Sequence, residues 1–333
     1  MRVSDRANAA TANRAIIDTL PAAGERPRVV YRYAGDRFIL VEYGEMVLDL
    51  TMNFRIFGLN DALKKTEVDG VIETVPALRS ILIQYDSLKL PTRRLVDTLQ
   101  KLEDTVPSID NLNIPSRRVE LPIAFADRWT RADIERYVKN IRQDAPNIVN
   151  GHNIEYIAQY NGLRDTADVI RYICATEWWN ACIGFWPGLP FMFPLDPRHA
   201  IVTPKYNPTR PWTPEGAVGI GGPCVAIYPV ASPGGYQLFG RTIPIFDLEQ
   251  RNPAFRENPI LLKPADRIQW VPVSDVELES IREQVVNGTF RYKVVSYETL
   301  NVRSYVAFLD SIKDEVAAFQ KRQAEAVKHV VIP

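Results

Sequence analysis

Apolar and polar positions follow two different periods along the first 125 residues. Residues 29–43 (VVYRYAGDRFILVEY) alternate with the two-residue period of β-strands on either side of Gly35-Asp36, which predicts a hairpin. Residues 52–65 and 91–106 place apolar side chains three and four positions apart, which predicts two helices. Further strands are predicted at 70–75, 80–85 and 117–125. Strands and helices mixed in this way indicate a compact α+β domain.

The pattern changes twice in the rest of the chain. Residues 130–177 have helical periodicity, with Thr130 and Asp133 at the spacing of a capping box and a helix end at Gly162. From Trp178 to Pro272, short apolar runs are separated by Gly and Pro, which is typical of a closed or sandwich-like β-domain. The apolar positions 305, 308, 309, 312, 316 and 319 predict a final helix with one face packed on the protein's own core or on a partner.

These patterns predict an α+β fold with two domains. Residues 1–177 form an α+β domain with a helical insert at about 130–177, and residues 178–333 form a β-domain with a C-terminal helical tail. We interpret the N-terminal stretch, with Ile16, Ile17 and Leu20 near its end, as a short amphipathic helix without the apolar core of a signal peptide.

Composition excludes several classes of protein. The chain of 333 residues has 40 Lys+Arg and 40 Asp+Glu, and this zero net charge argues against a nucleic-acid-binding protein. No apolar run approaches the roughly 18–20 residues that a membrane span needs. The three cysteines, at 174, 182 and 224, lie among apolar neighbours without metal-type spacing, as expected of reduced core thiols in a cytoplasmic protein.

Most familiar catalytic motifs are absent from the sequence. It has no G-x-x-x-x-G-K-[ST] loop, no G-x-G-x-x-G opening a helix, no G-x-S-x-G elbow and no H-E-x-x-H. The glycines of GAVGIGG alternate with Val218 and Ile220 as in a strand, which favours close backbone packing. With three histidines, no metal site is predicted, and His199 is the one we consider for a site. No methionine flanks a lysine, so a carried cofactor would come on another polypeptide.

A cluster of polar residues on stiff backbone remains: DPRH (196–199), KYNPTR (205–210) and PGGYQLFGR (233–241). Proline restricts the conformations of these loops and so lowers the entropy cost of holding a ligand. Arg210 and Arg241 are suited to a carboxylate or ureido oxygen, and Lys205 to a point charge or a proton transfer. Gly234-Gly235 permits close approach of the backbone to a ligand. The alternative is that the charged side chains form ion pairs that hold the loops together. We favour a site in which the two longer segments surround one cavity.

The segments PLDPRHAIVTPKYNPTRPWTPEGAVGIGG and SPGGYQLFGRT resemble the carboxyltransferase region of urea carboxylase. The likeness is to the half that is homologous to allophanate hydrolase subunit 1, which is also found in the sporulation kinase inhibitor family and in one subunit of bacterial 5-oxoprolinase. It extends over most of the chain, including YRYAGDRFILVEYG, VELPIAF and YIAQYNGL. The resemblance implies an α+β N-terminal domain followed by a cyclophilin-like β-barrel with C-terminal helices.

The resemblance also implies partners and a cofactor. A chain similar to allophanate hydrolase subunit 2 would complete the active site, and biotin would be carried on another subunit or domain beside a biotin carboxylase. The residues that match the catalytic loop are Lys205, Tyr206, Asn207 and Arg210. Those assigned to substrate or biotin are His199, Gly234, Gly235, Tyr236, Gln237 and Arg241.

The expected function is transfer of CO2 from carboxybiotin to a nitrogen of urea or of a urea-like amide or guanidine. One departure bears on the substrate: GFWPG has Phe185 where urea carboxylase has a G-D version, which favours a related amide, guanidine-like compound or lactam. Two alternatives to this function remain open. In the first, the chain is a subunit of an ATP-dependent hydrolase similar to 5-oxoprolinase. In the second, it is a non-enzymatic module that binds a kinase.

Overall fold

The computed structural model describes residues 15–333, so most of the expected N-terminal helix lies outside the described residues. Its last part is described and is a strand, β1 (Ile16–Leu20), which pairs with the next strand along the chain. The helix prediction is therefore wrong for these residues. The β-branched Ile16, Ile17 and Thr19 fit a pleated strand better than a helix, and the pairing partner supplies the backbone hydrogen bonds.

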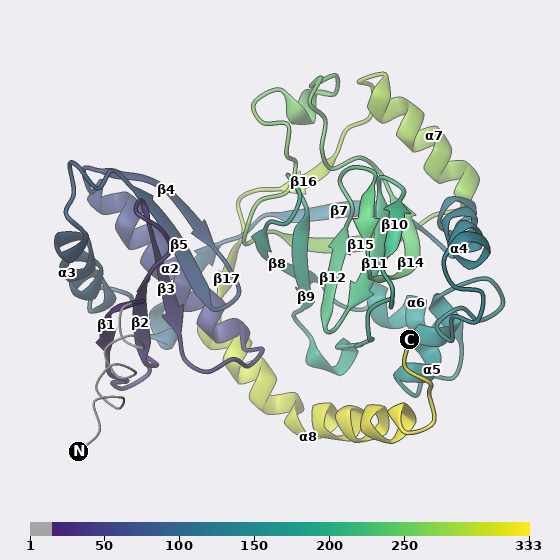
Figure 1. Cartoon of the computed structure of the whole chain (residues 1–333), viewed down its shortest axis with the longest axis horizontal. Helices are drawn as coiled ribbons and strands as arrows, with labels where there is room; N and C mark the ends of the chain where they lie inside the picture. The colour runs from purple at the N-terminus through teal and green to yellow at the C-terminus, as the bar shows by residue number, and fades with distance from the viewer. Residues whose placement is uncertain (1–14) are drawn as a thin grey trace, which may run out of the picture. The chain divides into compact units, whose positions relative to one another are not determined.

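The described residues divide into two compact units: residues up to 114 with 299–306, and residues 115–298 with 307–333. The first unit contains a five-stranded antiparallel sheet in the order β1-β2-β3-β5-β4, which Figure 1 shows in purple and blue. Its remaining strands are β2 (Val29–Tyr33), β3 (Phe38–Tyr43), β4 (Val71–Pro76) and β5 (Ser80–Tyr85). The predicted hairpin and the two strands after it are confirmed.

Helices α2 (Leu50–Thr66) and α3 (Thr92–Glu103) pack on this sheet, as their periodicity predicted. Alternate residues of β3 and β5 are buried, so one face of the sheet meets the apolar faces of both helices. Asp49 caps α2 because its carboxylate accepts a hydrogen bond from Thr51 N at 2.8 Å. A short ladder of β6 (Asn113–Pro115) and β17 (Thr299–Asn301) completes the unit.

The second unit is built around a barrel of seven strands, in the order β14-β11-β12-β9-β8-β15-β7. Pairing of β14 with the end of β7 closes it, and β16 pairs with the beginning of β7 outside the closure. The strands are β7 (Arg118–Phe125), β8 (Trp178–Ile183), β9 (Pro190–Pro194), β11 (Ala217–Gly221), β12 (Cys224–Ile227), β14 (Gln237–Thr242), β15 (Arg267–Pro272) and β16 (Lys293–Val295). A separate ladder joins β10 (Arg210–Thr213) to β13 (Ser232–Gly234).

Five of the described helices cover this barrel. They are α4 (Arg128–Asn140), α5 (Ile154–Tyr160), α6 (Thr166–Cys174), α7 (Asp275–Val286) and α8 (Val302–Val327). The apolar core of the barrel contains residues from β7 at one end of the unit's sequence to α8 at the other. The predicted tail helix is confirmed, and Phe319 on it is buried in the barrel core. The mixed fold with a barrel of cyclophilin-like type is confirmed as well. In the described part of the chain, no helix is long and apolar enough to span a bilayer.

The boundary between units differs from the expected division at 177/178. Strand β7 pairs in parallel with β15, about 150 residues further along the chain, so residues 115–177 belong with the barrel. Helices α5 and α6 bury Ile157 and Ile173 in the barrel core. The start of α4 differs as well. Asp127 caps it, its carboxylate accepting from Trp129 N and Thr130 N, so Thr130 lies inside the helix.

Candidate functional site

The two segments that the sequence singled out lie side by side. Residues 203–210 run into β10, and residues 233–241 run from β13 into β14. Three hydrogen bonds join them: Tyr206 N to Gly235 O at 2.7 Å, Gln237 Nε2 to Pro204 O at 2.9 Å, and Arg210 Nη1 to Tyr236 O at 2.6 Å. The β10–β13 ladder adds the pairing of Arg210 with Gly234. Residues that are about thirty positions apart in sequence therefore form one wall.

This wall borders a cavity of about 370 Å³. Its lining is mainly apolar, and Lys205 is the charged residue in it. The lining residues are Phe185, Leu189, Phe191, Lys205, Thr209, Ala226, Tyr228, Pro233, Gly234, Gly235 and Tyr236. Four of the ten residues expected at a site thus line it: Lys205, Gly234, Gly235 and Tyr236. We call this space the site cavity.

Lys205 and Tyr236 face each other within the site cavity. The Lys205 ammonium lies 5.5 Å from the centroid of the Tyr236 ring, within cation–π range. Burial raises the pKa of Tyr236 well above its ordinary value, and the neighbouring Cys224 raises it further. Burial also raises the pKa of the Cys224 thiol to about 12. Near neutral pH both groups are therefore uncharged, and Tyr236 is available as a hydrogen-bond donor but not as a base.

Glycines make room for the aromatic rings of the site cavity. A Cβ atom on Gly221 would lie 2.4 Å from Cδ1 of Tyr236, and one on Gly234 would lie 2.3 Å from the hydroxyl of Tyr228. Neither position tolerates a side chain without displacing a ring. The sequence GAVGIGG predicted close packing at the backbone of this strand. In the structure, the ring of Tyr236 packs closely against the backbone of β11 at Gly221.

Arg210 supports the site cavity from behind. Its side chain is completely buried and is not among the cavity-lining residues. Besides the bond to Tyr236 O, its guanidinium lies 3.2 Å from Asp133 Oδ2 and stacks 4.5 Å from the centroid of the Tyr206 ring. It also donates to Thr213 Oγ1 at 3.2 Å. The guanidinium is thus occupied by internal contacts.

Tyr206 and Gln237 are also internal. The Tyr206 hydroxyl donates to Asn153 Oδ1 at 2.8 Å, and burial raises its pKa to about 12. Gln237 is completely buried, and its Oε1 accepts from Asn147 Nδ2 at 2.9 Å. These bonds tie the wall to the segment that leads into α5. Asn207 is exposed, lies outside the lining, and its carbonyl accepts from Arg142 at 2.7 Å.

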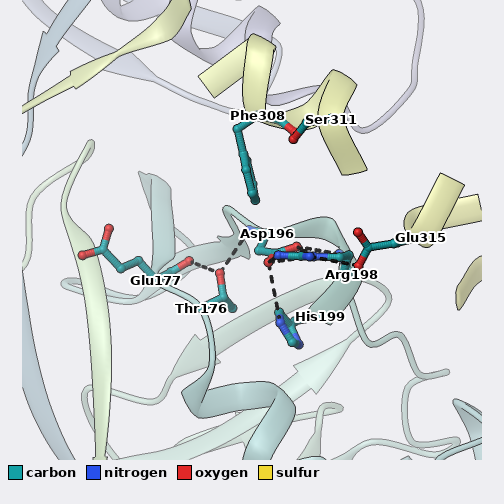
Figure 2. A network of polar contacts seen from close by, with 8 residues as sticks. All are labelled: Thr176, Glu177, Asp196, Arg198, His199, Phe308, Ser311 and Glu315. Carbon is teal, nitrogen blue, oxygen red and sulfur yellow. Dashed lines mark hydrogen bonds and ion pairs between the residues drawn. The ribbon is translucent and has the colours of Figure 1, made fainter. Parts of the chain in front are cut away.

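Arg241 and His199 lie apart from the site cavity. Arg241 stacks 4.8 Å from the centroid of Trp129, donates to Glu215 O at 2.8 Å, and lines a different cavity. Figure 2 shows His199 beside Asp196, with its Nε2 3.6 Å from the carboxylate. Burial lowers the pKa of His199, although Asp196 opposes that shift.

The network around Asp196 joins the barrel to α8. Arg198 forms a bidentate pair with Asp196 and reaches Glu315 of α8 at 2.9 Å (Figure 2). Thr176 Oγ1 accepts from Asp196 N at 3.0 Å. These contacts hold a helix in place, and His199 is part of that network. Within residues 15–333, no group of His, Cys, Asp and Glu is arranged to hold a metal ion.

Sequence reasoning missed several aromatic residues of the lining. Phe191 lies in β9 and Tyr228 directly follows β12, and the sequence pattern predicts strands there but no site. Phe185 was noted only as a departure from a family motif. It has a φ of 65°, is 78% exposed and lies at the edge of the site cavity. Left-handed backbone at a residue other than glycine is uncommon outside functional or strained positions.

The fold is a cyclophilin-like barrel with a smaller α+β unit, and its cavity is built from two loop segments. A family model described as "Carboxyltransferase domain, subdomain C and D" matches residues 29–256. This is more than half of the chain, and the chain belongs to that family.

Named relatives agree with this membership. The chain is 38% identical to the urea amidolyase of Lachancea kluyveri over 301 residues, which cover 90% of the chain and 16% of that protein. It is 28% identical to a subunit of the 5-oxoprolinase of Escherichia coli O157:H7, over 72% of the chain and 93% of that subunit. The crystal structure of the Kluyveromyces lactis urea carboxylase matches with a TM-score of 0.82 and 36% identity, over 94% of this chain and 28% of that one. The chain thus spans about a sixth of the length of the urea amidolyase it matches.

Proposed function

We propose that this chain is the carboxyltransferase part of a biotin-dependent carboxylase that transfers CO2 to a nitrogen of urea or of a urea-like amide or guanidine. One observation carries the proposal: two segments distant in sequence wall a single, mainly apolar cavity in which Lys205 and Tyr236 face each other. Membership of a carboxyltransferase family and the similarity to urea amidolyase support it.

The lining of the site cavity fits biotin. The bicyclic ring of biotin has an apolar sulfur-containing side and a planar ureido side, and the cavity combines aromatic walls with one cation and two glycines. Carboxylated biotin, when bound, would supply the activated CO2. In our proposal Lys205 and the backbone N–H groups of Gly234 and Gly235 bind and orient the ureido oxygen, and their positive charge density stabilises negative charge that develops there.

The remaining assigned residues act at different distances from the reacting atoms. Tyr236, neutral and partly buried, donates a hydrogen bond to substrate or biotin. Arg210 and Gln237 are positioning residues, because their donors are used on backbone carbonyls of the wall. Lys205 is the candidate for proton transfer, since Tyr206 is buried away from the cavity. Phe185 lies at the cavity edge, where an apolar side chain favours a substrate that is less polar than urea.

The proposal includes partners and a compartment. The chain corresponds to 16% of the urea amidolyase from Lachancea kluyveri, so the biotin carboxylase and the biotin carrier would be supplied by other chains or domains. We propose that a chain similar to allophanate hydrolase subunit 2 completes the site, and that the assembly works in the cytoplasm. His199, Asn207 and Arg241 were expected at the site, and they lie outside its lining.

Purification of the chain with its co-expressed partners tests the proposal. We expect release of ADP that depends on bicarbonate and on a urea-like substrate, and that avidin abolishes. Lys205→Ala should reduce turnover about a hundred-fold, the usual effect of losing one stabilising group at a developing anion. Lys293→Ala is the matched control, because Lys293 is an exposed lysine of the same unit that pairs with Glu120 on the barrel surface. Full turnover of Lys205→Ala, or turnover insensitive to avidin, would contradict the proposal.

A second function is favoured by one comparison. The chain covers 93% of the matching 5-oxoprolinase subunit of Escherichia coli O157:H7, so it corresponds to nearly all of that subunit. An ATP-dependent lactam or amide hydrolase would use the same cavity without biotin. The two functions differ in their requirements: the hydrolase would release ADP with 5-oxoproline in the absence of bicarbonate and of a biotin carrier, and avidin would leave it unaffected.

A further inference from the structure

A second cavity, of about 290 Å³, lies between α4 and the beginning of β10. It shares no lining residue with the site cavity. Its walls include Asp133, Arg136, Tyr137, Arg210 and Trp212. Of these residues, Arg210 alone has a role in the proposed function, through its hydrogen bond to Tyr236 O. We call this space the α4 cavity.

The α4 cavity contains a buried acceptor without a hydrogen bond. Asp133 is only 3% exposed, and its Oδ2 accepts no hydrogen bond from any described residue. The nearest cation is Arg210, whose Nε lies 3.2 Å away while its hydrogens are directed to Thr213 and Tyr236. Burial raises the pKa of Asp133 to about 6 despite that neighbour. A buried carboxylate oxygen without a donor is costly, and a ligand that brings an N–H group would remove this cost.

Another part of the lining is aromatic and carries a cation. Trp212 is 38% exposed, and the exposed side chain of Arg136 lies over its ring at 5.4 Å from the centroid. The indole face is thus a surface on which a guanidinium already stacks. Arg136 is an exposed residue of α4. If its side chain moved away from Trp212, it would lose this stacking contact. A small planar ligand could then occupy the same face.

We propose that the α4 cavity binds a small planar ligand rich in N–H donors, of the guanidinium, amidine or amide class, which stacks on Trp212 and donates to Asp133. The ligand replaces the guanidinium of Arg136 on the indole. An anion is a poorer fit, because the buried atom without a partner is an acceptor. The site is independent of the proposed function, since the two cavities have separate linings. It does adjoin Arg210, the residue that holds the Tyr236 carbonyl at the site cavity.

Indole signals of the full chain in a ¹⁵N–¹H correlation spectrum test the proposal. The chain has six tryptophans, and Trp212→Phe identifies the Trp212 signal by its loss. Guanidinium chloride is titrated at millimolar concentrations, far below the molar range that unfolds proteins. We expect a saturable shift of the Trp212 signal. Asp133→Asn should weaken the apparent affinity about ten-fold or more, since one charge-assisted hydrogen bond is lost. Asp144→Asn, which changes an exposed carboxylate with the same chemistry, should not.

Arg136→Ala gives an independent result. Because Arg136 competes for the indole and repels a cation, its removal should tighten guanidinium binding several-fold. The indole signals of the buried Trp178, Trp179 and Trp270 report whether each variant is folded. Lys205→Ala, at the site cavity, should leave the titration unchanged. The proposal is overturned if the Trp212 signal does not shift, if Asp133→Asn titrates like the parent protein, or if Arg136→Ala weakens binding, as an anion site would require.

Discussion

Arg210→Met tests whether the buried guanidinium holds the wall of the site cavity from behind. The replacement keeps an unbranched side chain but removes the 2.6 Å hydrogen bond to Tyr236 O and the cation 3.2 Å from Asp133. Loss of the hydrogen bond leaves the carbonyl of Tyr236 without its charged donor, which costs about 1–3 kcal/mol in the free energy of unfolding. We expect a total loss of about 2–4 kcal/mol in the free energy of unfolding at pH 7, because Asp133 adds a second contribution.

The contribution of Asp133 follows from its pKa. Beside Arg210 the carboxyl has a pKa of about 6, above its ordinary value of 3.8. This shift costs the folded state about 3 kcal/mol at pH 7. Without Arg210 the pKa rises further, and at pH 7 the carboxyl becomes protonated on folding. The cost then reaches a ceiling of about 4 kcal/mol, the free energy of protonating an ordinary aspartate at that pH. Asp133 therefore adds about 1 kcal/mol to the effect of the variant.

The direction of the pH dependence follows from the raised pKa of Asp133. A raised carboxyl pKa means that the folded protein binds a proton that the unfolded chain releases, so this group lowers stability as pH rises from about 4 through 6. At pH 5 the carboxyl of Asp133 is mostly protonated in both folded proteins. The difference between Arg210→Met and the parent should therefore shrink by about 1 kcal/mol between pH 7 and pH 5.

Urea unfolding followed by tryptophan fluorescence measures this difference. All six tryptophans lie between residues 129 and 270, so the signal reports on the barrel unit alone. Arg210→Met combined with Asp133→Asn should recover about 2 kcal/mol or more at pH 7, since no buried carboxylate remains. Arg131→Met, at an exposed arginine of α4 outside the α4 cavity, is the control. A loss below about 1 kcal/mol for Arg210→Met, or a loss that Asp133→Asn does not reduce, would refute the reasoning.

Two further predictions concern the lining and the network on α8. Gly221→Ala should displace the Tyr236 ring, lower stability by about 1–3 kcal/mol and reduce turnover, whereas Gly184→Ala, whose Cβ would have its nearest neighbour at 3.8 Å, should change stability little. Urea unfolding and the ADP-release assay measure both effects, and equal stability of the two variants would contradict the packing argument. His199 has a lowered pKa, so the unfolded chain binds its proton more readily and stability should fall as pH drops below about 6.5. His199→Gln should flatten this dependence in thermal unfolding, while His329→Gln, at an exposed histidine, should leave it unchanged.

Local patterns predicted most elements of the fold because each carries its own signal. The strands around Gly35 and the stripe of α3 need no distant partner to be recognised. The helix α7 was not predicted, although Ser274 and Glu277 form a capping box that marks its start. The unit boundary was missed for another reason. The pairing of β7 with β15 joins segments about 150 residues apart, and no local composition reports such a contact.

The sequence predicted that the two segments meet beside a cavity better than it predicted what their side chains contact. Stiff, polar loops with paired glycines indicated where a cavity would form, and the two segments do meet there. The sequence could not show which way each donor points. Arg210 is directed at a backbone carbonyl, and its carboxylate partner Asp133 lies 77 residues earlier on a helix that gave no sign of taking part. Arg241 matched the motif equally well and stacks on Trp129 instead.

The way the wall is built limits what this chain can do at the site cavity. Arg210 and Gln237 use their donors to hold the two segments together, which leaves Lys205 as the one charged residue among the eleven that line the cavity. A mainly apolar lining strengthens the interaction of that cation with an anion, because little solvent competes with it. Transfer of a carboxyl group develops negative charge on more than one oxygen, and a single cation does not match that distribution. Under the proposed function, we therefore expect the missing donors to come from the proposed partner chain, and the isolated chain to bind its ligands weakly without turning them over.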